Sequence, residues 1–174
     1  MTNKAIRTLV LAALFAALAC VATMVIQIPS PMNGYVNLGD CFVLLAGWVL
    51  GPVYGSLAAG IGSALADMFT GYMHYAPGTF LIKAVMALIA WALAKALISR
   101  FRGKRALCKG ISAVVAELFM VVGYYFYAGL LLGKGLGALG AAASIPGNLV
   151  QGAVGAIAAV LLSQVCLLYT SDAA

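Results

Sequence analysis

Long apolar runs separated by short polar steps divide this chain into segments of bilayer-spanning length. A membrane-spanning helix needs about 20 mostly apolar residues. The runs predict six helices, at about 5–26, 38–50, 53–70, 77–99, 110–132 and 146–168. The second is short for a full span, so we expect it to be tilted or partly embedded. The predicted fold class is therefore an all-α integral membrane bundle of six transmembrane helices.

The breaks between these runs carry residues that end helices. Pro29, Pro31 and Asn33-Gly34 follow the first helix, because proline cannot continue a helix and Asn-Gly favours a turn. Gly51-Pro52 separates the second and third helices. Residues 1–168 are expected to form a single membrane domain. The tail 169–174 lacks a basic anchor, and we interpret it as truncated or artefactual.

Composition supports the membrane assignment. Hydrophobic residues make up 65% of the 174 residues and charged residues only 8%, against about a quarter charged in soluble domains. The net charge of +6 comes mainly from basic residues near the N-terminus and in the 100–109 stretch. Because cytoplasmic loops are rich in Lys and Arg, this placement predicts cytoplasmic N- and C-termini and a cytoplasmic 100–109 loop. It indicates topology and no nucleic-acid partner. Contact of the 100–109 cluster with anionic lipid or with a cytoplasmic partner stays open.

Several kinds of chemistry lack their motifs. The chain has one histidine and no C-x-x-C pair, so we expect no metal site and no cofactor. It has no phosphate-binding G-x-x-x-x-G-K-[ST] motif, which excludes ATP hydrolysis by this chain. Nucleophile–base pairs are scarce, so an enzyme is disfavoured.

Ionisable residues inside membrane segments are the first functional candidates. Asp40 begins the second helix, where it either favours the helix dipole or contacts a ligand. Asp67 ends the third helix and Lys83 lies about two turns into the fourth. We expect Asp67 and Lys83 to pair across this hairpin, as a structural ion pair or as a ligand-binding pair.

Helices five and six add further candidates. Glu117 lies near the middle of the fifth helix, and Tyr124 and Tyr125 follow two turns later. Asn148 and Gln151 open the sixth helix one turn apart. Their amides can bind a heterocycle or join helices. All these polar groups except Glu117 fall in the outer half, which predicts a small-molecule pocket opening outward.

The first helix has an excess of small residues. Ala12/Ala16 and Ala13/Ala17 are small-xxx-small pairs, which permit close helix approach in lipid. Packing inside the bundle explains one such face. The two alanine pairs together give the first helix more small-residue surface than packing against one neighbouring helix requires.

Several short motifs in order resemble the substrate-binding S component of energy-coupling factor (ECF) vitamin transporters, especially the riboflavin, pyridoxine and hydroxymethylpyrimidine group. These motifs are Asn37-Leu38-Gly39-Asp40, Leu50-Gly51-Pro52-x-x-Gly55, Ala58-Ala59-Gly60-x-Gly62-Ser63, Ala66-Asp67-x-x-x-Gly71-Tyr72, Tyr75-Ala76-Pro77-x-Thr79 and Ile82-Lys83. The likeness is strongest over 35–95.

The resemblance implies a vitamin-capturing subunit of a prokaryotic plasma membrane. Such a subunit docks on a transmembrane coupling subunit that is driven by two cytoplasmic ATPase subunits. The implied docking face maps to Ala12 and Ala16, with Ala13 and Ala17 adjacent. The complete candidate substrate-binding set is Asn37, Asp40, Asp67, Tyr75, Lys83, Glu117, Tyr124, Tyr125, Asn148 and Gln151.

A second interpretation remains open from the residues alone. The chain would then be a stand-alone secondary transporter of a small organic solute, coupled to protons through Glu117 or Asp67. The two interpretations differ in whether uptake requires ATPase partners.

Overall fold

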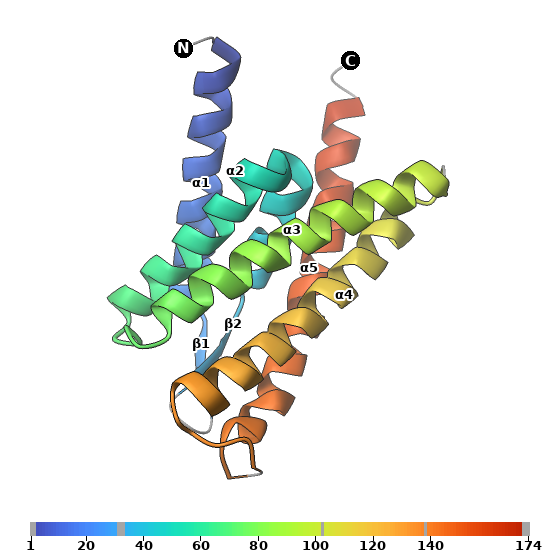
Figure 1. Ribbon diagram of the computed structural model, residues 1–174. Coiled ribbons are helices and arrows are strands. Elements are labelled where there is room, and N and C mark those ends of the chain that lie inside the picture. Colours follow the sequence, from blue (N-terminus) through green and yellow to red (C-terminus); the bar gives the residue numbers. More distant parts are fainter. Residues whose placement is uncertain (1–2, 31–33, 102, 138, 172–174) are drawn as a thin grey trace.

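The computed structural model describes residues 3–30, 34–101, 103–137 and 139–171. It contains five α-helices, a two-stranded hairpin and two short helical turns (Figure 1). The elements are α1 (Asn3–Val25), β1 (Gln27–Ser30), β2 (Gly34–Asn37), α2 (Asp40–Phe69), α3 (Ala76–Arg100), α4 (Arg105–Phe126), the π-helical turn η1 (Tyr127–Leu131), the 3₁₀ turn η2 (Ala141–Ser144) and α5 (Ile145–Ser171).

Five helices of the described chain are long and apolar enough to cross a membrane, where six were predicted. The segments expected at 38–50 and 53–70 are the two arms of α2, which bends at Gly51 (φ 79°, ψ −167°). A positive φ is readily adopted only by glycine, and Pro52 cannot donate a backbone hydrogen bond. The first arm, 40–50, is only about 16 Å long, too short to span a bilayer by itself.

The hairpin between α1 and α2 was not predicted. Strands β1 and β2 pair antiparallel, with Gln27 opposite Asn37 and Ile28 opposite Val36. The turn expected around Pro31 and Asn33 falls in 31–33, outside the described residues. The hairpin carries the chain from α1 to Asp40 and places Tyr35 and Asn37 at one end of the bundle.

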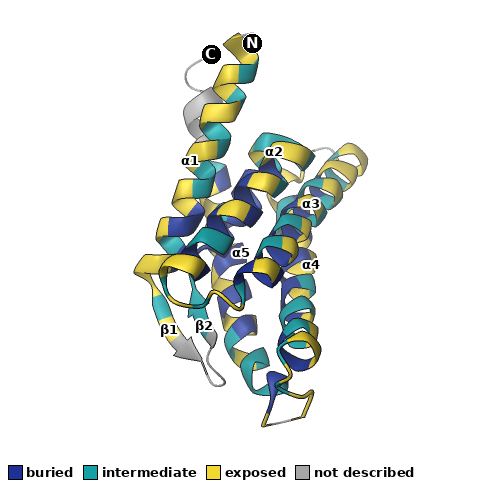
Figure 2. Cartoon of the chain, turned by 60° about the vertical axis from the view of Figure 1, so that its left-hand side comes forward, coloured by how far each residue is buried: buried dark blue, intermediate teal, exposed yellow. Residues whose placement is uncertain are grey.

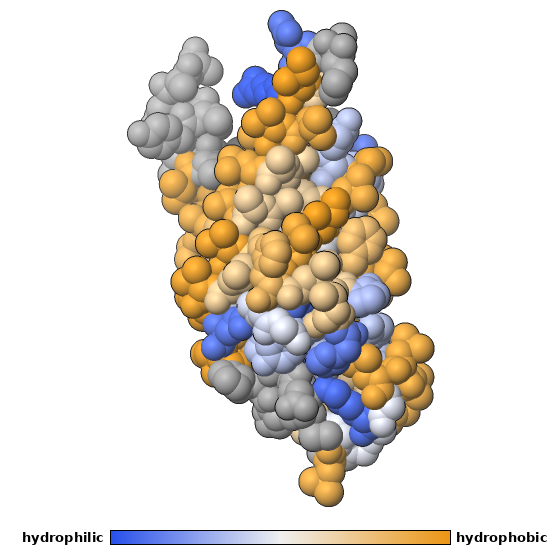
Figure 3. All heavy atoms as spheres, turned by 90° about the vertical axis from the view of Figure 1, so that its left-hand side faces the viewer, coloured by the Kyte–Doolittle hydropathy of each residue, from blue (hydrophilic) through white to orange (hydrophobic). Residues whose placement is uncertain are grey.

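The ends of the bundle differ in which connections they hold. Figure 1 places the start of α1, the end of α5 and the α3–α4 connection toward its upper end. The hairpin, the α2–α3 turn and the α4–α5 connection lie at the lower end. Between them, Figure 3 shows a face dominated by hydrophobic side chains, with hydrophilic groups at the upper tip and in the lower part. This distribution suits a bilayer-spanning body.

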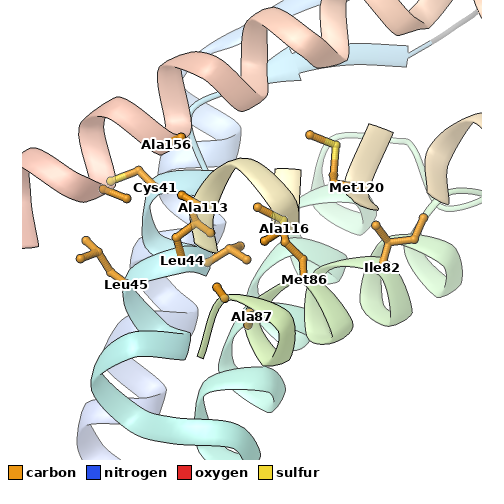
Figure 4. Close-up of a cluster of buried hydrophobic side chains, with 14 of the residues drawn as sticks. Cys41, Leu44, Leu45, Ile82, Met86, Ala87, Ala113, Ala116, Met120 and Ala156 are labelled. Carbon is orange, nitrogen blue, oxygen red and sulfur yellow. The ribbon is translucent and has the colours of Figure 1, made fainter. Parts of the chain in front are cut away.

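Side chains from α2, α3, α4 and α5 form the core (Figure 4). Leu44, Met86 and Met120 are fully buried in it. Glycines let the backbones approach closely. A Cβ added at Gly47 would lie 2.4 Å from the carbonyl oxygen of Ala87, so only glycine fits at this crossing of α2 and α3.

Helix α1 is the least buried of the five, because only 17% of its most apolar stretch is buried inside the protein (Figure 2). Its buried residues are Ala19, Cys20 and Thr23, near its C-terminal end. A Cβ at Gly62 of α2 would lie 2.3 Å from the carbonyl oxygen of Ala16. One side of α1 therefore packs tightly on α2, and the other side is uncovered.

We predict that Gly47→Ala destabilises the bundle by about 1–3 kcal/mol, the usual cost of overpacking a tight interior. The control is Gly110→Ala on α4, where an added Cβ meets nothing within 4 Å. There alanine's higher helix propensity should leave stability unchanged or raise it by up to about 1 kcal/mol. Equilibrium unfolding in detergent measures both, and equal stabilities would contradict this view of the α2–α3 crossing.

Candidate functional site

A cavity lies at the end of the bundle that holds the hairpin. Its empty space, counted out to its open mouth, is about 570 Å³. The residues that line it come from α1, β2, α2, α3, α4, α5 and the turns between them. They are Thr23, Tyr35, Asn37, Ser63, Asp67, Tyr75, Thr79, Lys83, Tyr124, Ala128, Ser144, Asn148 and Gln151. We call this cavity the chamber.

The step from β2 into α2 forms one wall of the chamber. The side chain of Asn37 accepts a hydrogen bond from the Gly39 amide (2.8 Å), which fixes the turn before α2. The backbone amide of Asn37 donates to Oε1 of Gln151 (2.9 Å), and its side-chain amide also reaches this oxygen (3.3 Å). A Cβ at Gly39 would lie 2.0 Å from the Thr23 hydroxyl, so glycine is required where α1 crosses this turn.

A buried ion pair stands beneath this wall. The ammonium of Lys83 pairs with Oδ1 of Asp40, and Nε2 of Gln151 donates to Oδ2 of the same carboxylate (2.6 Å). Both charged side chains are at most 3% exposed. The expected Asp67–Lys83 ion pair is therefore wrong, because the one ion pair among the described residues joins Lys83 to Asp40.

Asp67 has a different partner. The hydroxyl of Tyr35 on β2 donates to Oδ1 of Asp67. Burial, together with the nearby carboxylate, raises the pKa of Tyr35 well above its usual value, so this phenol stays protonated and serves as a donor. Among the described residues, no group hydrogen-bonds to the buried Oδ2 of Asp67 or to the buried hydroxyl of Ser63. Both atoms thus keep unused hydrogen-bonding capacity in residues that line the chamber.

Aromatic rings form another wall of the chamber. The hydroxyl of Tyr124 donates to Thr79 (3.0 Å), and the Lys83 ammonium lies 5.5 Å from the centre of the Tyr124 ring. The Tyr75 ring lies edge-on to it, 6.3 Å between centres. Lys134 donates to the Tyr75 hydroxyl (2.7 Å). The chamber therefore offers flat apolar surface beside fixed hydrogen-bonding groups.

Glu117 lies outside the chamber, behind the ion pair. It is 5% exposed, and neither carboxyl oxygen hydrogen-bonds within the described residues. Added Cβ atoms would lie 3.2 Å from its Oε2 at Gly152 and 3.1 Å from its Oε1 at Gly155. These two glycines of α5 leave the space that Glu117 occupies next to Asp40.

Seven of the ten candidate binding residues line the chamber: Asn37, Asp67, Tyr75, Lys83, Tyr124, Asn148 and Gln151. Asp40 and Glu117 lie behind its wall, and Tyr125 turns away, donating to the Leu136 carbonyl (3.0 Å). Sequence reasoning missed Thr23, Tyr35, Ser63, Thr79, Ala128 and Ser144. Of these, Ser63 and Thr79 lie inside the motifs that resemble the S-component family. Their place in those motifs was the sequence signal that could have identified them.

The described residues contain no group of three or more His, Cys, Asp or Glu side chains arranged to hold a metal ion. Together, the chamber and the apolar helices around it are the architecture of a membrane protein with a polar cavity of small-solute size. A family model described as "ECF-type riboflavin transporter, S component" matches residues 3–167. The chain belongs to this family of ECF transporter S components.

Individual proteins are also similar to this chain. An uncharacterised protein of Pyrococcus woesei is 35% identical over 138 residues, covering 79% of this chain and 86% of that protein. A solved structure described as the S component of a bacterial ECF transporter superposes with a TM-score of 0.71 and 25% identity, covering 94% of this chain and 97% of the other. The S component for biotin, at 18% identity, superposes with a TM-score of 0.58 over 92% of this chain and 89% of the other, and shows the shared fold.

The protein is therefore a membrane-spanning, non-enzymatic, substrate-binding subunit of an ECF transporter. S components of this kind bind vitamins and couple to an ECF module in the membrane. This membership favours substrate capture over the proton-coupled secondary transporter that the residues alone left open.

We predict that Lys83→Met destabilises the protein by about 3–5 kcal/mol, because it leaves the Asp40 carboxylate buried without its cation. The double variant Asp40→Asn/Lys83→Met removes both charges and should recover a large part of this loss. Equilibrium unfolding in detergent measures the cycle. Additive losses would show that the two side chains do not act as a pair.

Proposed function

We propose that the chamber captures a heterocyclic vitamin, with riboflavin as the first candidate, and presents it to the ECF module. The observation that carries this proposal is the combination of a tyrosine wall, two amide side chains and unsatisfied buried polar atoms in one cavity. The riboflavin description of the matching family model supports the choice of the first candidate.

The binding mode follows from the walls. A flat ring lies against Tyr124 and Tyr75, since aromatic faces stack on one another. Asn148 donates to and accepts from polar edges of the ring. The Gln151 oxygen is already bonded to Asn37 and its nitrogen to Asp40, so Gln151 adds only its second amide N–H as a donor. Hydroxyl groups elsewhere on the ligand donate to Asp67 Oδ2 and bond to the Ser63 hydroxyl. This arrangement favours a ligand with a planar heterocycle and a hydroxylated portion.

The orientation in the membrane is part of the proposal. Lys4, Arg7, Lys95 and the basic residues of the α3–α4 connection gather at the end opposite the chamber. By the positive-inside rule, that end faces the cytoplasm of a prokaryotic cell and the chamber opens outward. A vitamin then enters from outside, past the hairpin and Tyr75.

Docking on a transmembrane coupling subunit, driven by two ATPase subunits, is assigned to α1. Ala13 and Ala17 are exposed, whereas Ala12 and Ala16 are half-buried and Ala16 packs against Gly62 of α2. A helix with small exposed residues can receive a partner helix closely. Of the two alanine pairs, Ala13/Ala17 is therefore the better candidate for the docking face.

Riboflavin, pyridoxine and hydroxymethylpyrimidine should be titrated calorimetrically into the purified full chain. We expect Asn148→Ala to weaken binding of the preferred vitamin about 5- to 150-fold, because one desolvated hydrogen bond contributes about 1–3 kcal/mol. Tyr124→Leu should cause a similar loss through lost stacking.

Tyr125→Leu is the matched control, because Tyr125 is adjacent in sequence but lies outside the chamber. It should bind like the wild type. Equal losses in the Tyr124 and Tyr125 variants would place the ligand elsewhere, and the absence of binding by all three vitamins would reject this substrate class.

For docking, we predict that Ala17→Trp abolishes uptake and co-purification with the coupling subunit while vitamin affinity stays within about twofold. A bulky side chain blocks close helix approach and lies far from the chamber walls. Ala153→Trp on α5 is the control, since Ala153 is also an exposed alanine, and it should leave uptake intact. Normal uptake by the Ala17 variant would exclude this face of α1.

A further inference from the structure

A second cavity lies away from the chamber, where α2, α3 and α4 meet near the basic end of the bundle. Its empty space, counted to its open side, is about 730 Å³. The residues that define it here are Trp48, Trp91, Ala94, Lys95, Ile98 and Lys109. We call it the Trp–Lys groove. The groove shares no lining residue with the chamber.

The groove holds two lysine–tryptophan pairs. The ammonium of Lys95 lies 5.0 Å from the centre of the Trp91 ring, and that of Lys109 lies 5.3 Å from the centre of the Trp48 ring. The Trp48 indole is fixed in place, because its Nε1 donates to the Ala90 carbonyl and to the Ser112 hydroxyl, both at 3.2 Å. Two cations thus lie over indole rings on neighbouring helices, and hydrogen bonds fix one of these rings, that of Trp48.

The electrostatic surroundings favour an anion. The described acidic residues, Asp40, Asp67 and Glu117, are all buried around the chamber. The end of α3, the α3–α4 connection and the start of α4 add Arg100, Lys104 and Arg105 at this end of the bundle. The described part of this end is therefore positive, and an anionic group entering the groove is attracted by several cations at once.

The depth of the groove suits a lipid headgroup. Helix α3 has 25 residues and is about 37 Å long, longer than the roughly 30 Å hydrocarbon core of a bilayer. If α3 is centred in the bilayer, Lys95, about 7 Å before its end, lies just inside the edge of the hydrocarbon core, from where its long side chain reaches the headgroups. Tryptophan and lysine are the side chains enriched at this interface, and Ala94 and Ile98 provide apolar wall beside the ammonium groups.

We propose that the Trp–Lys groove binds the phosphodiester headgroup of an anionic phospholipid, with the glycerol and upper acyl chain against the apolar wall. Basic pockets between transmembrane helices bind such headgroups in general. The groove lies between α2, α3 and α4, and both of its lysines are on α3 and α4, whereas α1 is on the other side of the bundle in both Figure 1 and Figure 2. This separation favours lipid over the coupling subunit as the occupant.

The test is native mass spectrometry of the purified full chain titrated with dioleoyl-phosphatidylglycerol or dioleoyl-phosphatidylcholine. We expect a preference for phosphatidylglycerol of about tenfold or more. The double variant Lys95→Gln/Lys109→Gln should lose most of this preference, because each lysine is expected to contribute about fivefold to the affinity for phosphatidylglycerol. Arg100→Gln/Lys104→Gln removes the same charge at the same end but outside the groove, and should change the affinity by less than about threefold.

Lys95→Gln alone is a safeguard against misfolding, because Lys95 is exposed; it should show its own fivefold loss with unchanged thermal unfolding. Equal lipid preference in wild type and variants would overturn the proposal. Equally tight binding of free glycerol phosphate would show that the site takes a soluble phosphate instead of a lipid. Unchanged lipid preference with lost co-purification of the coupling subunit would assign the groove to protein docking and also overturn it.

Discussion

The buried pair of Lys83 and Asp40 is the interaction on which the rest of the chamber depends. An ion taken out of water costs several kcal/mol unless its charge is paired and its remaining hydrogen-bonding atoms are satisfied. Here the second carboxylate oxygen is satisfied by Gln151, whose own oxygen is held by Asn37. The requirement to satisfy one charge pair thus joins α3, α2, α5 and β2, and the walls of the chamber are fixed as its consequence.

Small residues make that assembly feasible in a membrane. Lipid provides little hydrophobic drive between helices, so close packing must provide the attraction. Gly47 against Ala87 and Gly62 against Ala16 bring backbones within reach, and Gly152 and Gly155 leave room for Glu117 beside Asp40. The Ala12/Ala16 face of α1 is therefore used in packing against α2. The other face remains small, apolar and uncovered, which is why docking was assigned to it.

The sequence predicted the periodic features well and the side-chain pairings poorly. Asn148 and Gln151 both reach the chamber, because residues three apart share a helix face. Tyr124 and Tyr125 are separated by about 100° around α4, so only one faces inward, and periodicity alone did not choose between them. Lys83 pairs with Asp40, which also accepts from Gln151, whereas Asp67 accepts from Tyr35; these partners come from β2 and α5 and could not be read from helix periodicity. Tyr35 was missed because Pro29 and Pro31 were interpreted as a simple turn, whereas the chain forms a β-hairpin there.

The first arm of α2 is too short to span the membrane, but side-chain contacts hold it at both ends. Asp40 at its start is held by Lys83 and Gln151, and Trp48, two turns later, is held by Ala90 and Ser112. The bend at Gly51 then frees the second arm to pack along α1 and α3 on its own course. Because α3 supplies both Lys83 and Ala90, and α4 carries both Tyr124 and Ser112, the helices α2, α3 and α4 border both the chamber and the Trp–Lys groove. The two sites are therefore built on one rigid unit, and α1, which borders the chamber only near Thr23, is left as the element that can contact a partner without disturbing either.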